Sequence, residues 1–171
     1  MQARMSTTID PPRQRLSAEQ WVEQFQVGWQ ARLGPEVFAE HFRPLLSPDV
    51  RLVGPQLPPL TGFEAFKESF VRPTFALIPD IHGEVERWVV SEDGQTLYIE
   101  LTLRGTIGRR EIAFRACDRL SMREGVAIER ESYFDPGALI AALARSPRAW
   151  PVFIRVQTAR LSGALGKRSR R

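Results

Sequence analysis

The sequence is poor in the residues that bind metals and form disulfides. It contains one cysteine, Cys117, and two histidines, His41 and His82. A single cysteine cannot form a disulfide within the chain, and two isolated histidines do not make a metal-ligand cluster. A glycine-rich phosphate loop is also missing. We therefore expect neither a bound metal nor a nucleotide cofactor.

Long apolar runs are missing as well. No stretch approaches the roughly 20 apolar residues of a membrane-spanning helix, and residues 1–15 lack the apolar region of a signal peptide. With 43% hydrophobic and 26% charged residues, the composition is typical of a globular domain. We expect a cytoplasmic protein with a flexible arm at 1–16, a folded domain at 17–145 and a basic, partly amphipathic extension at 146–171.

Positive charge is concentrated at the end of the chain. The net charge is +4, but residues 145–171 hold eight basic side chains and no acidic one, so residues 1–144 carry a net charge of −4. A nucleic-acid-binding fold would spread lysine and arginine over a folded face, so we expect no nucleic-acid partner. We expect the extension to pack as a helix with a dispensable end at 166–171. The alternative is an amphipathic segment on an anionic membrane.

Helical patterns dominate the first part of the chain. A capping box at residues 17–20 precedes aromatic residues at helical spacing, and residues 61–64 (T-G-F-E) form a second box of this kind. We expect helices from residue 18 to about 33, from 35 to 46, and from 61 until a kink or an end at Pro73. Residues 54–59 contain three prolines and predict an irregular loop.

Strand patterns dominate the second part. We expect strands at residues 49–53, 81–90, 96–107, 111–123 and 126–134, and a final helix at 136–145 after Asp135-Pro136. Helices followed by a meander of long strands indicate an α+β fold with helices on one face of the sheet.

Asp118 is the exception on the apolar face of its strand. The even-numbered residues from Ile112 to Met122 are otherwise apolar, whereas most odd-numbered ones are polar. A carboxylate on such a face needs a partner, a proton or a ligand.

The next strand offers Arg130 as the partner. A three-residue loop at residues 123–125 sets Asp118 opposite Arg130 and places Arg119 near Glu129 on the outer face. A two-residue loop would set Asp118 against Glu131, and like charges disfavour that register. We predict an Asp118–Arg130 ion pair on the core side, either as a structural pair that closes the core or as the polar base of a ligand pocket.

Three short motifs carry a family resemblance. They are G-F-E-A-F at 62–66, D-R-L-S-M-R-E-G at 118–125 and Y-F-D-P at 133–136. In this order and spacing, residues 17–145 resemble the nuclear transport factor 2-like superfamily, and within it the SnoaL-like proteins. That branch includes polyketide cyclases and relatives of ketosteroid isomerase and limonene epoxide hydrolase. The resemblance implies a cone-shaped, antiparallel or mixed sheet wrapped around the N-terminal helices, an extra C-terminal helix, and a homodimer.

The resemblance also implies a pocket between the sheet and the helices. Asp118 and Arg130 are the candidate catalytic residues: Arg130 would stabilise an enolate or carboxylate, and Asp118 would orient Arg130 or move a proton. The candidate ligand-binding residues are Trp29, Phe66, Phe70, Phe114, Leu120 and Ser132.

The catalytic residues of the relatives are not all present. The base of the isomerases would fall at residues 52–54, which are Leu-Val-Gly, and Ser132 stands where the epoxide hydrolases have an aspartate. We therefore expect little or no activity of either kind. Two functions remain open. One is binding of a polyketide-, steroid- or terpenoid-like apolar molecule, with or without cyclase- or isomerase-type chemistry; the other is a non-catalytic, dimerising interaction module with a basic tail.

Overall fold

The computed structural model describes residues 16–55 and 57–155, and it confirms the predicted α+β class. Six strands form one open, mixed sheet in the order β2-β1-β6-β5-β4-β3, in which β1 and β6 run parallel and all other neighbours run antiparallel. The strands are β1 (Leu46–Gly54), β2 (Leu57–Thr61), β3 (His82–Val90), β4 (Thr96–Ile107), β5 (Arg110–Arg123) and β6 (Val126–Phe134).

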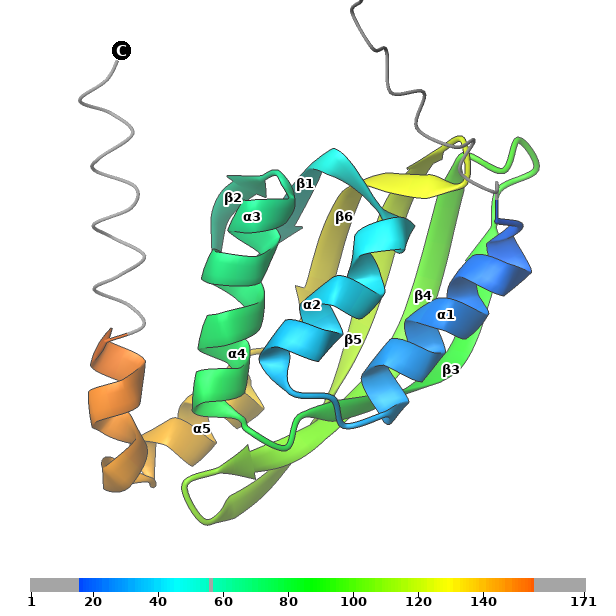
Figure 1. Cartoon of the computed structure of the whole chain (residues 1–171). Helices are drawn as coiled ribbons and strands as arrows, with labels where there is room; N and C mark the ends of the chain where they lie inside the picture. The colour runs from blue at the N-terminus through cyan, green and yellow to red at the C-terminus, as the bar shows by residue number, and fades with distance from the viewer. Residues whose placement is uncertain (1–15, 56, 156–171) are drawn as a thin grey trace, which may run out of the picture.

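The N-terminal helices lie together over one face of this sheet, as Figure 1 shows. Helix α1 spans Ala18–Gln30, and α2 spans Pro35–Phe42 before a 3₁₀ turn at Arg43–Leu45. A third helical stretch contains α3 (Phe63–Ala65), a π-helical segment (Phe66–Val71) and α4 (Arg72–Leu77). Within the described residues, no helix is long and apolar enough to cross a membrane.

The chain continues beyond the sheet with further helical turns. Helix α5 spans Gly137–Ala144, a 3₁₀ turn covers Pro147–Ala149, and residues 150–155 are helical. The Asp135 carboxylate accepts a hydrogen bond from the Gly137 N–H at 2.8 Å, but the N-cap of α5 is Pro136 and no side chain caps this helix. Except for residue 16, the predicted arm at 1–16 lies outside the described residues, as does the dispensable end at 166–171, and the domain boundaries stay a prediction.

Aromatic packing holds the helices to one another. Trp21, Phe25 and Trp29 form the buried stripe of α1, and the predicted capping box at Ser17 and Gln20 starts this helix. The stripe packs edge-to-face against the α2 phenylalanines, with Trp29 and Phe38 ring centroids 4.9 Å apart. Such pairs stabilise a core beyond the burial of their area. The buried stripe of α1 is therefore part of the hydrophobic core.

Two sequence predictions near residue 60 were wrong. The expected irregular loop contains strand β2, because β2 is an edge strand, where proline is tolerated without loss of a ladder hydrogen bond. The expected capping box at 61–64 does not form. Thr61 ends β2, and α3 begins after Gly62, whose φ is +91°, without a side-chain cap.

Pro73 does not end its helix. The preceding π-helical segment, in which the Arg72 N–H bonds to the Lys67 carbonyl, leads into Pro73 at the first turn of α4. Proline has no N–H and its ring crowds the preceding turn, so a locally widened turn accommodates it inside a helix. Instead of ending at Pro73, the helical stretch therefore continues through a widened, π-helical turn.

The β5–β6 hairpin has a different register from the predicted one. A two-residue turn, Glu124-Gly125, joins the strands, and both residues have positive φ, as a type I′ turn requires. A β-bulge at Ile128 then shifts the ladder, so that Asp118 lies opposite Ser132. From Glu129 onward the observed partner differs from the predicted one by two residues, so these side chains keep their predicted face. Between the turn and the bulge the shift is one residue, and Met122 lies opposite the fully buried Ala127 instead of Val126.

Candidate functional site

A cavity of about 140 Å³ lies between the sheet and the helices; we call it the inner cavity. Six of the predicted site residues line it, namely Trp29, Phe70, Phe114, Asp118, Arg130 and Ser132. Phe66 and Leu120 do not. Both are at most 1% exposed, but Phe66 packs among the other helix phenylalanines and Leu120 lies closer to the hairpin turn. These two residues belong to the core.

Asp118 is the centre of a buried polar cluster. Its side chain is 0% exposed, and its Oδ2 accepts hydrogen bonds from Arg130 Nε at 2.8 Å and Arg130 Nη2 at 2.7 Å. Its Oδ1 accepts a hydrogen bond from the Ser132 hydroxyl at 2.6 Å. The predicted ion pair is thus confirmed. Because both carboxylate oxygens are used, the burial of this charge is well compensated.

Arg130 is held from two directions. Asp118 fixes one edge of the guanidinium, and the rings of Phe70, Phe25 and Trp29 surround it at 5.2, 5.8 and 6.0 Å from its Cζ. Aromatic faces attract a cation at these distances. Among the described residues, nothing accepts a hydrogen bond from Nη1. Asp118 and the three rings therefore fix the position of the guanidinium, and its Nη1 can still donate hydrogen bonds.

Trp29 adds a second unused donor. The residue is 2% exposed and lines the inner cavity, and its Nε1 is buried without a hydrogen-bond partner among the described residues. Leaving such a group unpaired costs about 1–3 kcal/mol. From the sequence we predicted Trp29 only as an apolar wall, because helical spacing carries no information about the partner of an indole N–H.

The remaining lining is almost entirely apolar. Among the described residues that line the inner cavity, Asp118 is the only carboxylate, and there is neither a histidine nor a glutamate. Sequence reasoning missed much of this lining. Ala116 and Phe134 share the face of Asp118 by strand parity, and Leu77 follows Phe70 and Thr74 at helical spacing, so these signals were available. Phe153 could not be predicted in this way, because only the tertiary structure brings the segment after α5 to this cavity.

The other reactive side chains lie apart from the inner cavity. The Nε2 of His41 lies 2.7 Å from the Gln24 carbonyl, and the Nδ1 of His82 lies 2.9 Å from the Asp80 carbonyl. Burial, followed by the nearby Asp118 charge, raises the pKa of the Cys117 thiol, which makes it a poor nucleophile at neutral pH. No cluster of three or more potential metal ligands was found in the part of the chain that the structure describes.

Three solved structures illustrate how this fold recurs. A candidate SnoaL-like polyketide cyclase from Jannaschia sp. CCS1 is 19% identical, with a TM-score of 0.61 over 78% of this chain and 99% of that chain. An epoxide hydrolase of M. tuberculosis, similar to limonene epoxide hydrolase, is 18% identical, with a TM-score of 0.56 over 77% and 92%. TerC, co-crystallised with polyporic acid, is 18% identical, with a TM-score of 0.60 over 71% and 96%. At these identities the similarity establishes the fold alone.

The sequence itself identifies the family. Among curated proteins no sequence matches the chain. The model of the SnoaL-like domain family, however, matches residues 19–130, which span nearly all of α1, strands β1 to β5, the first half of β6 and both members of the Asp118–Arg130 pair. The chain belongs to the SnoaL-like domain family.

Proposed function

We propose that this protein binds a small apolar molecule with one oxygen function in the inner cavity. The observation that carries the proposal is the Asp118–Arg130–Ser132 cluster, a satisfied polar base in an otherwise apolar cavity. Ligand sites are typically apolar with a few fixed polar groups. The unused donors on Arg130 and Trp29 would both suit a carbonyl oxygen.

The size of the inner cavity limits the ligand. An apolar cavity of about 150 Å³ accommodates benzene, so about 140 Å³ suits one ring or a short branched chain. A steroid-sized ligand would need wall movement or would extend beyond the cavity. A monocyclic terpenoid-like compound, or one ring of a polyketide, would therefore suit the volume of the inner cavity better than a steroid.

The chemistry that this base supports is stabilisation of negative charge on oxygen. If the bound carbonyl compound loses an α-proton, the guanidinium of Arg130 would stabilise the enolate oxygen in a low-dielectric site. Asp118 positions Arg130, since both of its oxygens are already hydrogen-bonded. The described residues of the lining offer no second carboxylate or histidine as a proton acceptor, so binding is the primary function that we propose.

A binding screen with matched ligands tests this proposal. Thermal shift and calorimetry would compare cyclic ketones with hydrocarbons of equal size. The Trp29→Phe variant removes the indole N–H, and Trp88→Phe is its matched control, because Trp88 is 37% exposed. We expect Trp29→Phe to weaken ketone binding about tenfold, the equivalent of roughly 1.4 kcal/mol, and to leave hydrocarbon binding unchanged. A screen without any ketone binding would refute the proposal and favour the interaction module.

Turnover assays address the enzyme alternatives. We expect no robust turnover of a limonene epoxide or a Δ5-ketosteroid, because Ser132 and Leu52-Val53-Gly54 replace groups that those reactions need. Robust turnover of either substrate would show that another residue supplies the missing base.

A further inference from the structure

A second, larger cleft lies outside the inner cavity. It has a volume of about 1040 Å³ and lies between the β4–β5 turn and the segment that follows α5. The cleft shares only Leu77 with the lining of the inner cavity. Four arginines line it, in two pairs far apart in the sequence: Arg109 and Arg110 on the β4–β5 turn, and Arg145 and Arg148 after α5.

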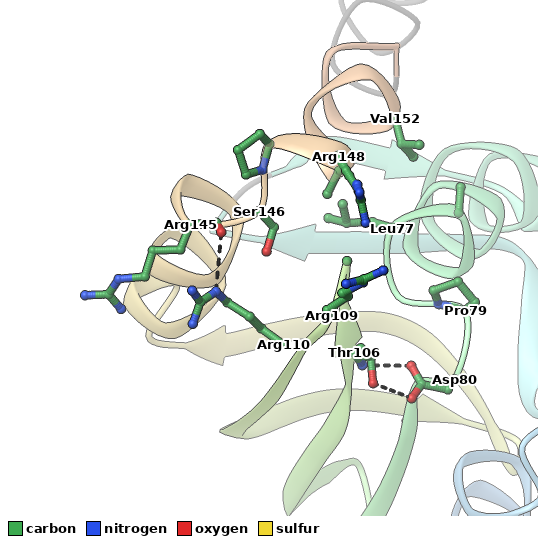
Figure 2. Close-up of a pocket in the computed structure, with 14 residues that line it drawn as sticks. Leu77, Pro79, Asp80, Thr106, Arg109, Arg110, Arg145, Ser146, Arg148 and Val152 are labelled. Atoms are coloured by element: carbon green, nitrogen blue, oxygen red, sulfur yellow. Dashed lines mark hydrogen bonds between the residues drawn. The ribbon is translucent and has the colours of Figure 1, made fainter.

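Two hydrogen bonds hold the two arginine-bearing segments together. Arg110 Nε donates to the Arg145 carbonyl at 3.3 Å, and the buried Ser146 hydroxyl donates to the Ile107 carbonyl at 3.2 Å. Figure 2 shows the side chains of Arg109 and Arg148 extending into the same space from opposite sides, whereas that of Arg145 points away. Hydrogen bonds from side chains to backbone carbonyls thus bring two like charges into the same cleft.

Among the described residues that line the cleft, the one carboxylate already accepts hydrogen bonds. Asp80 accepts hydrogen bonds from the Thr106 N–H at 2.7 Å and from the Thr106 hydroxyl at 2.8 Å. Neither Arg109 nor Arg148 has an ion pair or a hydrogen bond with any described residue. Elsewhere on the surface, arginines such as Arg43, Arg72 and Arg87 are paired with glutamates. The cleft therefore has a local excess of positive charge.

We propose that this cleft binds the phosphate group of a small soluble ligand, between Arg109 and Arg148. Guanidinium groups bind phosphate oxygens through paired, charge-assisted hydrogen bonds. The apolar walls at Leu77, Pro79 and Val152 would contact the organic part of the ligand. This site is separate from the inner cavity, and its ligand differs in charge from the neutral carbonyl compound proposed there.

Calorimetry on the full chain tests the proposal, with phenyl phosphate and inorganic phosphate as probes and benzyl alcohol as the uncharged control. The test variant is Arg109→Gln/Arg148→Gln. The matched control is Arg104→Gln/Arg123→Gln, which removes the same charge from two exposed arginines outside the cleft. Both variants retain the other basic residues of the chain, so charge alone cannot account for a difference between them.

We expect one phosphate site per chain that weakens at least tenfold in the test variant and stays within twofold in the control. Phenyl phosphate should bind more tightly than inorganic phosphate because of the apolar walls. Equal weakening of phosphate binding in both variants would overturn the proposal. So would binding to vesicles that contain phosphatidic acid if neither soluble probe binds. Ketone binding in the inner cavity should be the same in all three proteins, so the two proposals fail independently.

Discussion

Asp118 lies opposite Ser132 in the β5–β6 ladder, yet its two guanidinium contacts come from Arg130, two residues earlier on β6. The long arginine side chain reaches diagonally along the inner face, which side chains on neighbouring strands can do. This leaves the Ser132 hydroxyl free to bond to the other carboxylate oxygen. The bulge at Ile128 therefore gives Asp118 two partners, whereas the register predicted from the sequence provides one.

The Asp118–Arg130 pair should show strong energetic coupling. Asp118→Leu or Arg130→Met alone leaves a buried charge unpaired and should cost about 3–5 kcal/mol of unfolding free energy. The double variant should cost clearly less than the sum of the two. Urea unfolding of the four proteins measures the coupling. Ser132→Ala, which removes one hydrogen bond, should cost only about 1 kcal/mol. Strictly additive single effects would contradict the pairing.

Glu129 should contribute stability that depends on pH. The hydrogen bond from Arg51 at 2.6 Å holds the pKa of Glu129 below its ordinary value of 4.5. Burial opposes this effect by raising the pKa, and the nearby Arg119 lowers the pKa further. A carboxyl group with a lowered folded-state pKa stabilises the fold above its unfolded pKa, and this contribution is lost as the pH falls through the folded pKa. Glu129→Gln should therefore lower the melting temperature at pH 7, and the difference should disappear well below pH 4.5. A constant difference between pH 7 and pH 3 would contradict this prediction.

Gly105 should tolerate no side chain. A Cβ added at this position would overlap Ile78 Cγ2 and would lie 3.3 Å from the Cα of Ile81. Gly105→Ala should cost about 1–3 kcal/mol, as overpacking a core does. Gly54→Ala is the matched control in another strand, since no atom lies within 4 Å of its added Cβ. Chemical denaturation should separate the two variants, and equal stability would contradict the prediction.

We expect the chain to form a homodimer through the outer face of its sheet. Val89, Tyr98 and Tyr133 are 61%, 42% and 50% exposed there, among charged side chains. The Val89→Lys/Tyr133→Lys variant should therefore become monomeric by sedimentation velocity. Val37→Lys on α2, a position that is 59% exposed, should remain dimeric. A monomeric wild-type chain at high micromolar concentration would refute the expectation.

Local patterns were enough to predict most elements. Strands β4 and β6 have the expected bounds, because period-2 alternation over many residues leaves few alternatives. The start of α1 was also predictable, since the capping box is a local signal. Around residues 54–73 local signals failed. The prolines of β2 are acceptable only at a sheet edge, and Pro73 is acceptable only after a π-helical turn.

The sequence by itself determined the fold class, the face of the β6 residues beyond the bulge, and the presence of Asp118 and Arg130 on the inner side. Strand parity is a property of the backbone, so a register error of two residues left it intact. Only the tertiary structure decided that Ser132 completes the cluster, that the Trp29 N–H is buried without a partner, and that Arg109 and Arg148 converge. These relationships depend on a bulge, on helix packing, and on contacts between segments nearly 40 residues apart. None of these leaves a periodic signal in the sequence.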